Sequence, residues 1–118
     1  AELHAIGGYI QGMGYALMED VYYAPDGRVY NPNFSAYHIP TALDIPEKIN
    51  VDFVEAGYIR GPFGAKGLGE PVIVGVAPSI ANAVAHALRD KKAKYAVNKI
   101  PLTPDYVYGI IKKFGLNK

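Results

Sequence analysis

Glu70 is the residue of this sequence whose surroundings are best suited to chemistry. It follows a loop that contains Gly64, Gly67 and Gly69, and it directly precedes Pro71. Glycines let a backbone approach a ligand closely and point N–H groups at it. A glutamate held at the end of such a loop could act as a general base beside the ligand. It could also be an acid at the start of a helix, where its charge would complement the helix dipole.

Other reaction chemistries find little support in the residue pattern. The glycine loop is a weak mononucleotide site, because Lys66 is not followed by serine or threonine. His4, His38 and His86 are far apart, and none has a second metal ligand three or four residues away. We therefore predict no metal site made by side chains, and structural or exposed histidines. Cysteine is absent, and no serine lies in a nucleophile-elbow motif.

The composition predicts one folded unit of ordinary charge. The 118 residues are 50% hydrophobic and 19% charged, with a net charge of +1, which excludes a disordered or strongly basic chain. The sequence has neither an apolar run long enough to span a bilayer nor a signal peptide. We therefore expect a cytoplasmic chain that binds neither nucleic acid nor membrane. Its first residue, Ala1, fits a processed product or a fragment of a longer chain.

A first helix is predicted from His4 to Met18, because apolar residues recur there at helical spacing. This apolar face consists of Ile6, Ile10, Met13 and Leu17. We expect it to be exposed when the chain is alone. The same helix contains Gly7, Gly8, Gly12 and Gly14. Each interior glycine costs about 1 kcal/mol relative to alanine, so the glycines should serve either tight helix packing or approach to a ligand.

The remaining pattern predicts an α+β fold of about three helices, a few strands and the glycine-rich loop. Residues 21–30 have the turn chemistry of a hairpin, and residues 49–53 alternate like a half-buried strand. Residues 72–76 suit either a strand, by propensity, or a helix that begins at Pro71. Further helices are predicted at 78–89 and after Thr103.

Four blocks of the sequence resemble the molybdenum hydroxylases, the family of xanthine dehydrogenase, aldehyde oxidase and the large chain of aerobic carbon monoxide dehydrogenase. Residues 61–71, GPFGAKGLGEP, resemble the family's GPxGAKGxGEP segment. Residues 11–19, QGMGYALME, are similar to its QGxGxALxE helix, and residues 37–46, YHIPTALDIP, to its YxxPTxxDxP loop. Residues 77–84, APSIANAV, are similar to its APAIANAV helix. Residues 1–6 depart from the family, which more often has a glycine–glutamine pair there.

The resemblance implies that residues 1–118 form a single C-terminal segment of a much longer molybdopterin-binding subunit. Glu70 falls on the family's general base, which takes a proton from a hydroxide on molybdenum that attacks an electrophilic carbon. The substrate would be an aldehyde, an N-heterocycle or carbon monoxide. The segment would then be part of a larger oxidoreductase and inactive alone. The alternative is a non-catalytic structural fragment that packs against a larger molybdopterin subunit.

The resemblance also implies a cofactor and partners. The cofactor would be molybdopterin with molybdenum, with or without a cytosine nucleotide. Iron–sulfur clusters and FAD would be carried by partner domains or subunits, beside the remaining molybdopterin-binding chain. The cofactor contacts implied are Gln11 and Gly12 on the first helix, and Gly64, Ala65, Lys66, Gly67, Leu68 and Gly69 in the loop.

Overall fold

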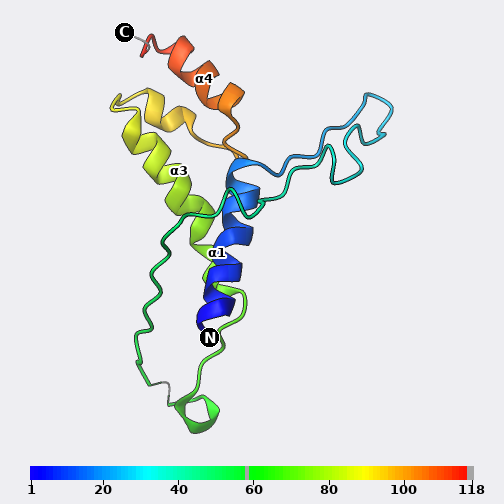
Figure 1. The fold of residues 1–118 in the computed structure, drawn as a ribbon. Coiled ribbons are helices and arrows are strands. Elements are labelled where there is room, and N and C mark those ends of the chain that lie inside the picture. Colours follow the sequence, from blue (N-terminus) through cyan, green and yellow to red (C-terminus); the bar gives the residue numbers. More distant parts are fainter. Residues whose placement is uncertain (58, 117–118) are drawn as a thin grey trace.

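A computed structural model describes residues 1–57 and 59–116 of the chain (Figure 1). Four α-helices and two short 3₁₀ helices follow one another along the sequence. They are α1 (Glu2–Leu17), η1 (Pro62–Gly64), α2 (Pro71–Val74), α3 (Val76–Ala87), η2 (Ala93–Ala96) and α4 (Pro104–Lys113). The helices predicted at 4–18, at 78–89 and after Thr103 are therefore confirmed, with ends shifted by a few residues at most. None of the helices among the described residues is long and apolar enough to cross a membrane.

The centre of the molecule is the packing of α1 against α2 and α3. A Cβ atom at Gly8 would lie 3.0 Å from the Val72 Cβ, and one at Gly12 would lie 2.5 Å from the Val76 Cβ. Gly12 therefore needs to be glycine, because a Cβ there would collide with Val76, and a Cβ at Gly8 would fit only if Val72 moved slightly. The two contacts also show that α1 runs alongside α2 and α3 in the same direction, as Figure 1 shows.

The apolar face of α1 is packed rather than exposed, which corrects the sequence expectation. Met13 is buried, and Ile10 and Leu17 are half-buried. Other segments of the same chain therefore cover part of this face, although α2 and α3 themselves pack against the face of α1 that contains Gly8 and Gly12. The final segment is also joined to α1, because the Leu102 N–H donates a hydrogen bond to the Ala16 carbonyl oxygen at 2.7 Å.

The strands of the predicted α+β class are not confirmed. Within residues 1–57 and 59–116 the β structure is a single isolated antiparallel bridge between Tyr23 and Val29, at the base of the predicted hairpin. Residues 49–53 are not a strand, because no neighbouring segment offers the hydrogen bonds that a ladder needs. Residues 71–74 form helix α2, so the helical alternative is right there and the strand alternative is wrong. Pro71 at the first helical position explains this, since its missing N–H costs nothing there.

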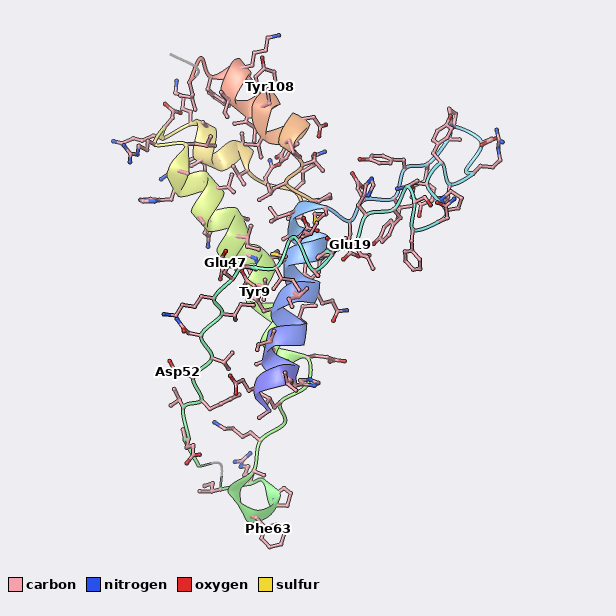
Figure 2. All side chains as sticks on the ribbon, viewed as in Figure 1. Tyr9, Glu19, Glu47, Asp52, Phe63 and Tyr108 are labelled. Carbon is pink, nitrogen blue, oxygen red and sulfur yellow. The ribbon has the colours of Figure 1, made fainter. Side chains whose placement is uncertain are left out.

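Two long excursions leave this helical body. One is an arm of residues 20–46, and the other runs from residue 47 to η1 and back to α2 (Figure 1). Phe63 lies at the outer end of the second excursion, while Glu47 and Asp52 lie along its outgoing limb (Figure 2). The radius of gyration is 17.9 Å, against about 13–14 Å for a compact domain of this length. The shape is therefore far more open than that of a self-contained domain.

The buried core is correspondingly small. Its hydrophobic members are mostly alanines, and among the described residues no large side chain is completely buried. The accessible surface is 9251 Å², whereas a folded monomer of this mass exposes about 6,300 Å². The chain therefore keeps roughly 3,000 Å² of surface that a compact protein would bury.

Candidate active site

A pocket of about 530 Å³ lies between the first half of α1 and the start of α2. Its volume falls within the range of small-molecule sites. It is lined by Leu3, His4, Gly7, Gly8, Gln11, Gly69, Glu70 and Ile73. Residues more than fifty positions apart in the sequence are thus brought together by the parallel packing of α1 with α2 and α3.

The helix register places the polar residues of this pocket relative to one another. Gly8 faces Val72 and Gly12 faces Val76. A step of four residues along α1 is therefore matched by a step of four residues from α2 into α3. By the same register, Glu70 is level with the second turn of α1, between His4 and Gln11. These two residues are separated by seven positions, two helical turns, and so lie on one face of α1 about 10 Å apart along its axis.

Glu70 occupies the N-cap position of α2, where Pro71 follows at the first helical position. Its own backbone is helical, with φ −60° and ψ −24°, and its carbonyl oxygen accepts the Ile73 N–H at 3.0 Å. The carboxylate makes no capping hydrogen bond to α2. Glu70 therefore does stand at a helix start, as one interpretation of the sequence held. Its side chain nevertheless remains available to the pocket that it lines.

The glycine loop reaches this pocket only at its end. Gly69 lines it, whereas the stretch from Gly64 to Leu68 lies outside its lining, on the path from η1 to α2. Most of this stretch is exposed, although Leu68 is half-buried. The backbone N–H groups of residues 66–69 donate no hydrogen bond to another described residue. Such N–H groups can bind an anionic or polar ligand.

The predicted contacts on α1 divide into two kinds. Gln11 is exposed and lines the pocket beside Glu70. Gly12 is buried against Val76 and is absent from the pocket lining, so the structure gives it a packing role. Of the two explanations for the helix glycines, packing therefore holds for Gly8 and Gly12. Gly7 differs, because a Cβ there would meet nothing within 4 Å.

His4 is the functional candidate that the sequence did not single out. His4 is exposed, which is one of the two predicted alternatives, and it also lines the same pocket as Glu70. Its spacing from Gln11 on the predicted helix could have indicated this, but only after Gln11 had been placed at a site. Among the described residues, no group of three or more His, Cys, Asp or Glu side chains could hold a metal ion.

Comparison with known proteins points to one group of enzymes. A family model described as a molybdopterin cofactor-binding domain matches residues 1–46. The putative xanthine dehydrogenase molybdenum-binding subunit of Escherichia coli (strain K12) is 40% identical over 117 residues, which cover 98% of this chain. Aldehyde oxidase 2 of Rattus norvegicus is 40% identical over 106 residues, covering 86% of this chain. The gamma subunit of the 6-hydroxypseudooxynicotine dehydrogenase complex of Paenarthrobacter nicotinovorans is 38% identical over 116 residues, covering 96% of this chain.

Solved structures agree with these sequence matches. The structure of the Cu,Mo-CO dehydrogenase in its carbon monoxide reduced state superposes with a TM-score of 0.88 at 27% identity. The match covers 99% of this chain and 14% of that one. Quinoline 2-oxidoreductase from Pseudomonas putida 86 superposes with a TM-score of 0.79 at 28% identity, over 95% of this chain and 14% of that one. The present chain spans only 15%, 14% and 8% of the bacterial xanthine dehydrogenase subunit, the gamma subunit and the aldehyde oxidase, respectively.

Proposed function

Because the chain belongs to the molybdenum hydroxylase family, matching a fragment of its molybdopterin-binding subunit, we propose that it supplies Glu70 as the general base of such an enzyme. One observation carries the proposal. Glu70 stands on a proline-anchored turn and lines a ligand-sized pocket together with Gln11 and Gly69. The proposal assigns residues 1–118 to a single C-terminal segment of the subunit, which is inactive without the rest of it.

The residues around the pocket fit a molybdopterin cofactor. Gln11 offers an exposed side-chain amide, and the loop offers the N–H groups of residues 66–69, which suit the polar and phosphate groups of such a molecule. Gly7 leaves open space where a side chain would otherwise stand. We assign cofactor contacts to Gln11, to Gly69 and to the loop from Gly64 to Leu68. We assign none to Gly12, whose position is explained by Val76.

When bound, the cofactor supplies the two-electron oxidation of the substrate, and this chain supplies the proton chemistry. Glu70 accepts at its carboxylate the proton that the oxygen nucleophile loses as it attacks the substrate carbon. The turn before α2 fixes the backbone from which that carboxylate projects toward the pocket. The substrate class we propose is an aldehyde, an N-heterocycle or carbon monoxide.

We further propose that the working enzyme contains other chains or domains. They comprise the remaining molybdopterin-binding chain and carriers of iron–sulfur clusters and FAD, which take the electrons away. One relative is named as a subunit of a dehydrogenase complex, which supports a multi-subunit assembly. The cytosine dinucleotide form of the cofactor belongs to the same proposal.

The test is the substitution Glu70→Gln in the assembled enzyme. We expect turnover to fall by about 10²–10⁴-fold, the usual contribution of a general base, because the amide cannot accept the proton. Molybdenum content should stay near that of the unmodified enzyme. Glu47→Gln is the matched control, since Glu47 is an exposed glutamate outside the pocket (Figure 2). It should leave turnover unchanged.

Normal turnover in the Glu70→Gln enzyme would refute the base assignment. The chain would then be the structural fragment that packs against a larger molybdopterin subunit. A parallel loss of molybdenum and of turnover would instead assign Glu70 to cofactor retention.

A further inference from the structure

The segment that follows α3 carries most of the positive charge of this chain. Residues 89–113 contain seven of the twelve lysines and arginines and only two of the eleven acidic residues, Asp90 and Asp105. All seven basic side chains are exposed. Among residues 1–57 and 59–116 a single ion pair is present, between Arg28 and Asp26 in the arm. None of the seven cations is therefore neutralised by a carboxylate of the described chain.

The fold gathers these cations at one end of the molecule. η2 contacts both α3 and α4, and Figure 1 shows η2, α4 and the end of α3 at the opposite end of the molecule from η1. Where α3 ends, the surface forms a hollow of about 190 Å³, which we call the basic hollow. It is lined by Ala85, His86, Arg89, Asp90, Lys91 and Lys94. Three exposed cations thus surround one concave site.

Asp90 is the only acidic residue that lines the basic hollow, and its carboxylate is already used by the backbone. Its Oδ1 accepts hydrogen bonds from the Lys92 N–H at 2.8 Å and from the Ala93 N–H at 2.7 Å. It makes no ion pair with the three cations of the hollow. The basic hollow therefore keeps its positive charge and suits an anionic side chain.

Arg89 has a backbone conformation that its side chain makes costly. Its φ is +53°, and it directly follows Leu88, the C-cap of α3. Glycine is the usual residue at such a position, because a Cβ is disfavoured in the left-handed region. The Arg89 N–H donates to the His86 carbonyl oxygen at 3.2 Å, which glycine would do equally well. No ion pair within the described chain offsets this cost, and strain of this kind is typical of functional positions.

We propose that the basic hollow docks an acidic surface of another protein chain in the assembled enzyme. A carboxylate of that chain lies between Arg89 and Lys94 and accepts charge-assisted hydrogen bonds from them. Tyr95 in η2 and Tyr108 in α4 are 75% and 59% exposed (Figure 2), and arginine and tyrosine are enriched in protein interfaces. The inference rests on the proposed function only in requiring that the enzyme contain a further chain.

Two observations favour a separate, acidic protein as the occupant. The contact is polar, as is typical between separately folded partners, whereas the apolar excursions suit burial within one subunit. Nucleic acid fits less well, because residues 1–88 contain nine acidic and four basic residues and would repel a long polyanion.

The test begins with the enzyme purified together with all its chains. A carbodiimide joins a lysine amine to a carboxylate in direct contact. Mass spectrometry of the product should find Lys91 or Lys94 joined to an acidic residue of a different chain. About 0.5 M salt should suppress these cross-links, because it screens exposed charges.

Variants then measure the affinity of the molybdopterin-binding subunit for the chain that the cross-links identify. Arg89→Gly should weaken binding about 3–10-fold. The thermal midpoint of the subunit should stay equal or rise, because glycine suits the left-handed backbone, so unfolding cannot explain the loss. Arg89→Glu should weaken binding more than about 10-fold. Lys112→Glu is the matched control, since Lys112 is exposed in α4 outside the basic hollow, and it should change the affinity less than about 2-fold.

Several results would reject the docking role. They are an absence of cross-links from Lys91 and Lys94, cross-links only within one subunit or between two copies of it, unchanged affinity in Arg89→Gly, or equal effects of Arg89→Glu and Lys112→Glu. An enzyme that purifies without a further chain, or with nucleic acid at this end of the molecule, would also reject it. A failure of the proposed function looks different, because turnover would survive Glu70→Gln while the Arg89 variants would still weaken docking.

Discussion

At the scale of single residues, Glu70 shows how one position can satisfy two interpretations that the sequence left open. It stands at the start of α2, as a helix-start acid would, and it lines the pocket, as a general base must. The two interpretations are compatible because the carboxylate makes no capping hydrogen bond to the helix. Position at a helix start therefore does not exclude a role in chemistry.

A second residue-scale feature is the hydrogen bond that attaches the arm of residues 20–46 to α1. The Tyr37 hydroxyl donates to the Glu19 Oε2 at 2.6 Å, close to the C-terminal end of α1. This hydrogen bond to Glu19 is the main reason that the pKa of Tyr37 is raised above its ordinary value. The bond exists only while the phenol keeps its proton.

The sign of the pH dependence follows from that raised pKa. Because the pKa of Tyr37 is higher in the folded protein, its hydrogen bond stabilises the docked arm fully at any pH below the ordinary tyrosine pKa of about 10. This stabilisation is lost as the pH rises through the folded-state pKa. Tyr37→Phe should therefore speed proteolytic cleavage within residues 20–46 a few-fold at pH 7–9. At a pH above the raised pKa of Tyr37, the unmodified protein and the variant should be cut at similar rates.

Tyr30→Phe provides the control for this measurement. Tyr30 lies in the same arm, is exposed, and makes no side-chain hydrogen bond to another described residue. Its substitution should not change cleavage at any pH. Equal cleavage of the Tyr37→Phe variant and the unmodified protein at pH 8 would contradict a docking role for the Tyr37–Glu19 bond.

At the scale of elements, the glycines of α1 decide how closely the helices approach. The glycines cost helix propensity, yet Gly12 leaves no room for a Cβ beside Val76, and Gly8 leaves little beside Val72. Close approach of α1 to α2 is also what brings Glu70 level with the pocket face of α1. The same glycines that lower the helix propensity of α1 therefore allow the close helix packing that places Glu70 beside the pocket.

The substitution Gly12→Ala tests this link. The new Cβ would stand 2.5 Å from the Val76 Cβ, so the helices must separate. Overpacking of this kind costs about 1–3 kcal/mol, which should outweigh the gain of about 1 kcal/mol from replacing a helical glycine. We expect a lower thermal midpoint for the protein as purified with its partners.

Gly109→Ala is the matched control within another helix. Gly109 lies in α4, and a Cβ there would meet nothing within 4 Å. This change should leave the thermal midpoint unchanged or raise it, through helix propensity alone. If the thermal midpoint of the Gly12→Ala protein equals that of the Gly109→Ala protein, the expectation is contradicted. The contact between α1 and α3 would then adjust to the new Cβ without loss of stability.

At the scale of the whole molecule, the open shape is what we expect of a chain that packs against other protein, as the proposed function requires. Leu43, Val54, Ile59 and Phe63 are each at least 89% exposed, and they lie on the two excursions rather than on the helical body. Exposed apolar side chains gathered in such numbers are typical of interfaces. This agrees with a chain that spans about one seventh of the bacterial subunits it matches.

The 118-residue chain alone should therefore associate. We expect light scattering after size-exclusion chromatography to give a mass above 12.8 kDa, and a hydrophobic dye to bind. Coexpression with the remaining molybdopterin-binding chain should remove both effects, because the excursions would then be covered. A stable 12.8 kDa monomer that binds no dye would contradict the interface assignment.

The sequence by itself determined α1, α3 and α4, the turn at residues 21–30 and the motif that contains Glu70. These features depend on local periodicity, on the positions of proline and glycine, and on residue order, all of which can be read from the sequence without the fold. The family resemblance was likewise carried by four ordered blocks of residues, and the comparisons confirm it.

The tertiary structure decided everything that depends on neighbours distant in sequence. It separated Gly12, which packs against Val76, from Gln11, which faces the pocket, although the two are adjacent in the chain. It placed His4 beside Glu70, and it left residues 49–53 without the partner that a strand requires. The physical reason is the same in each case. Packing and strand pairing are properties of two segments together, and the spacing within either segment does not specify the other.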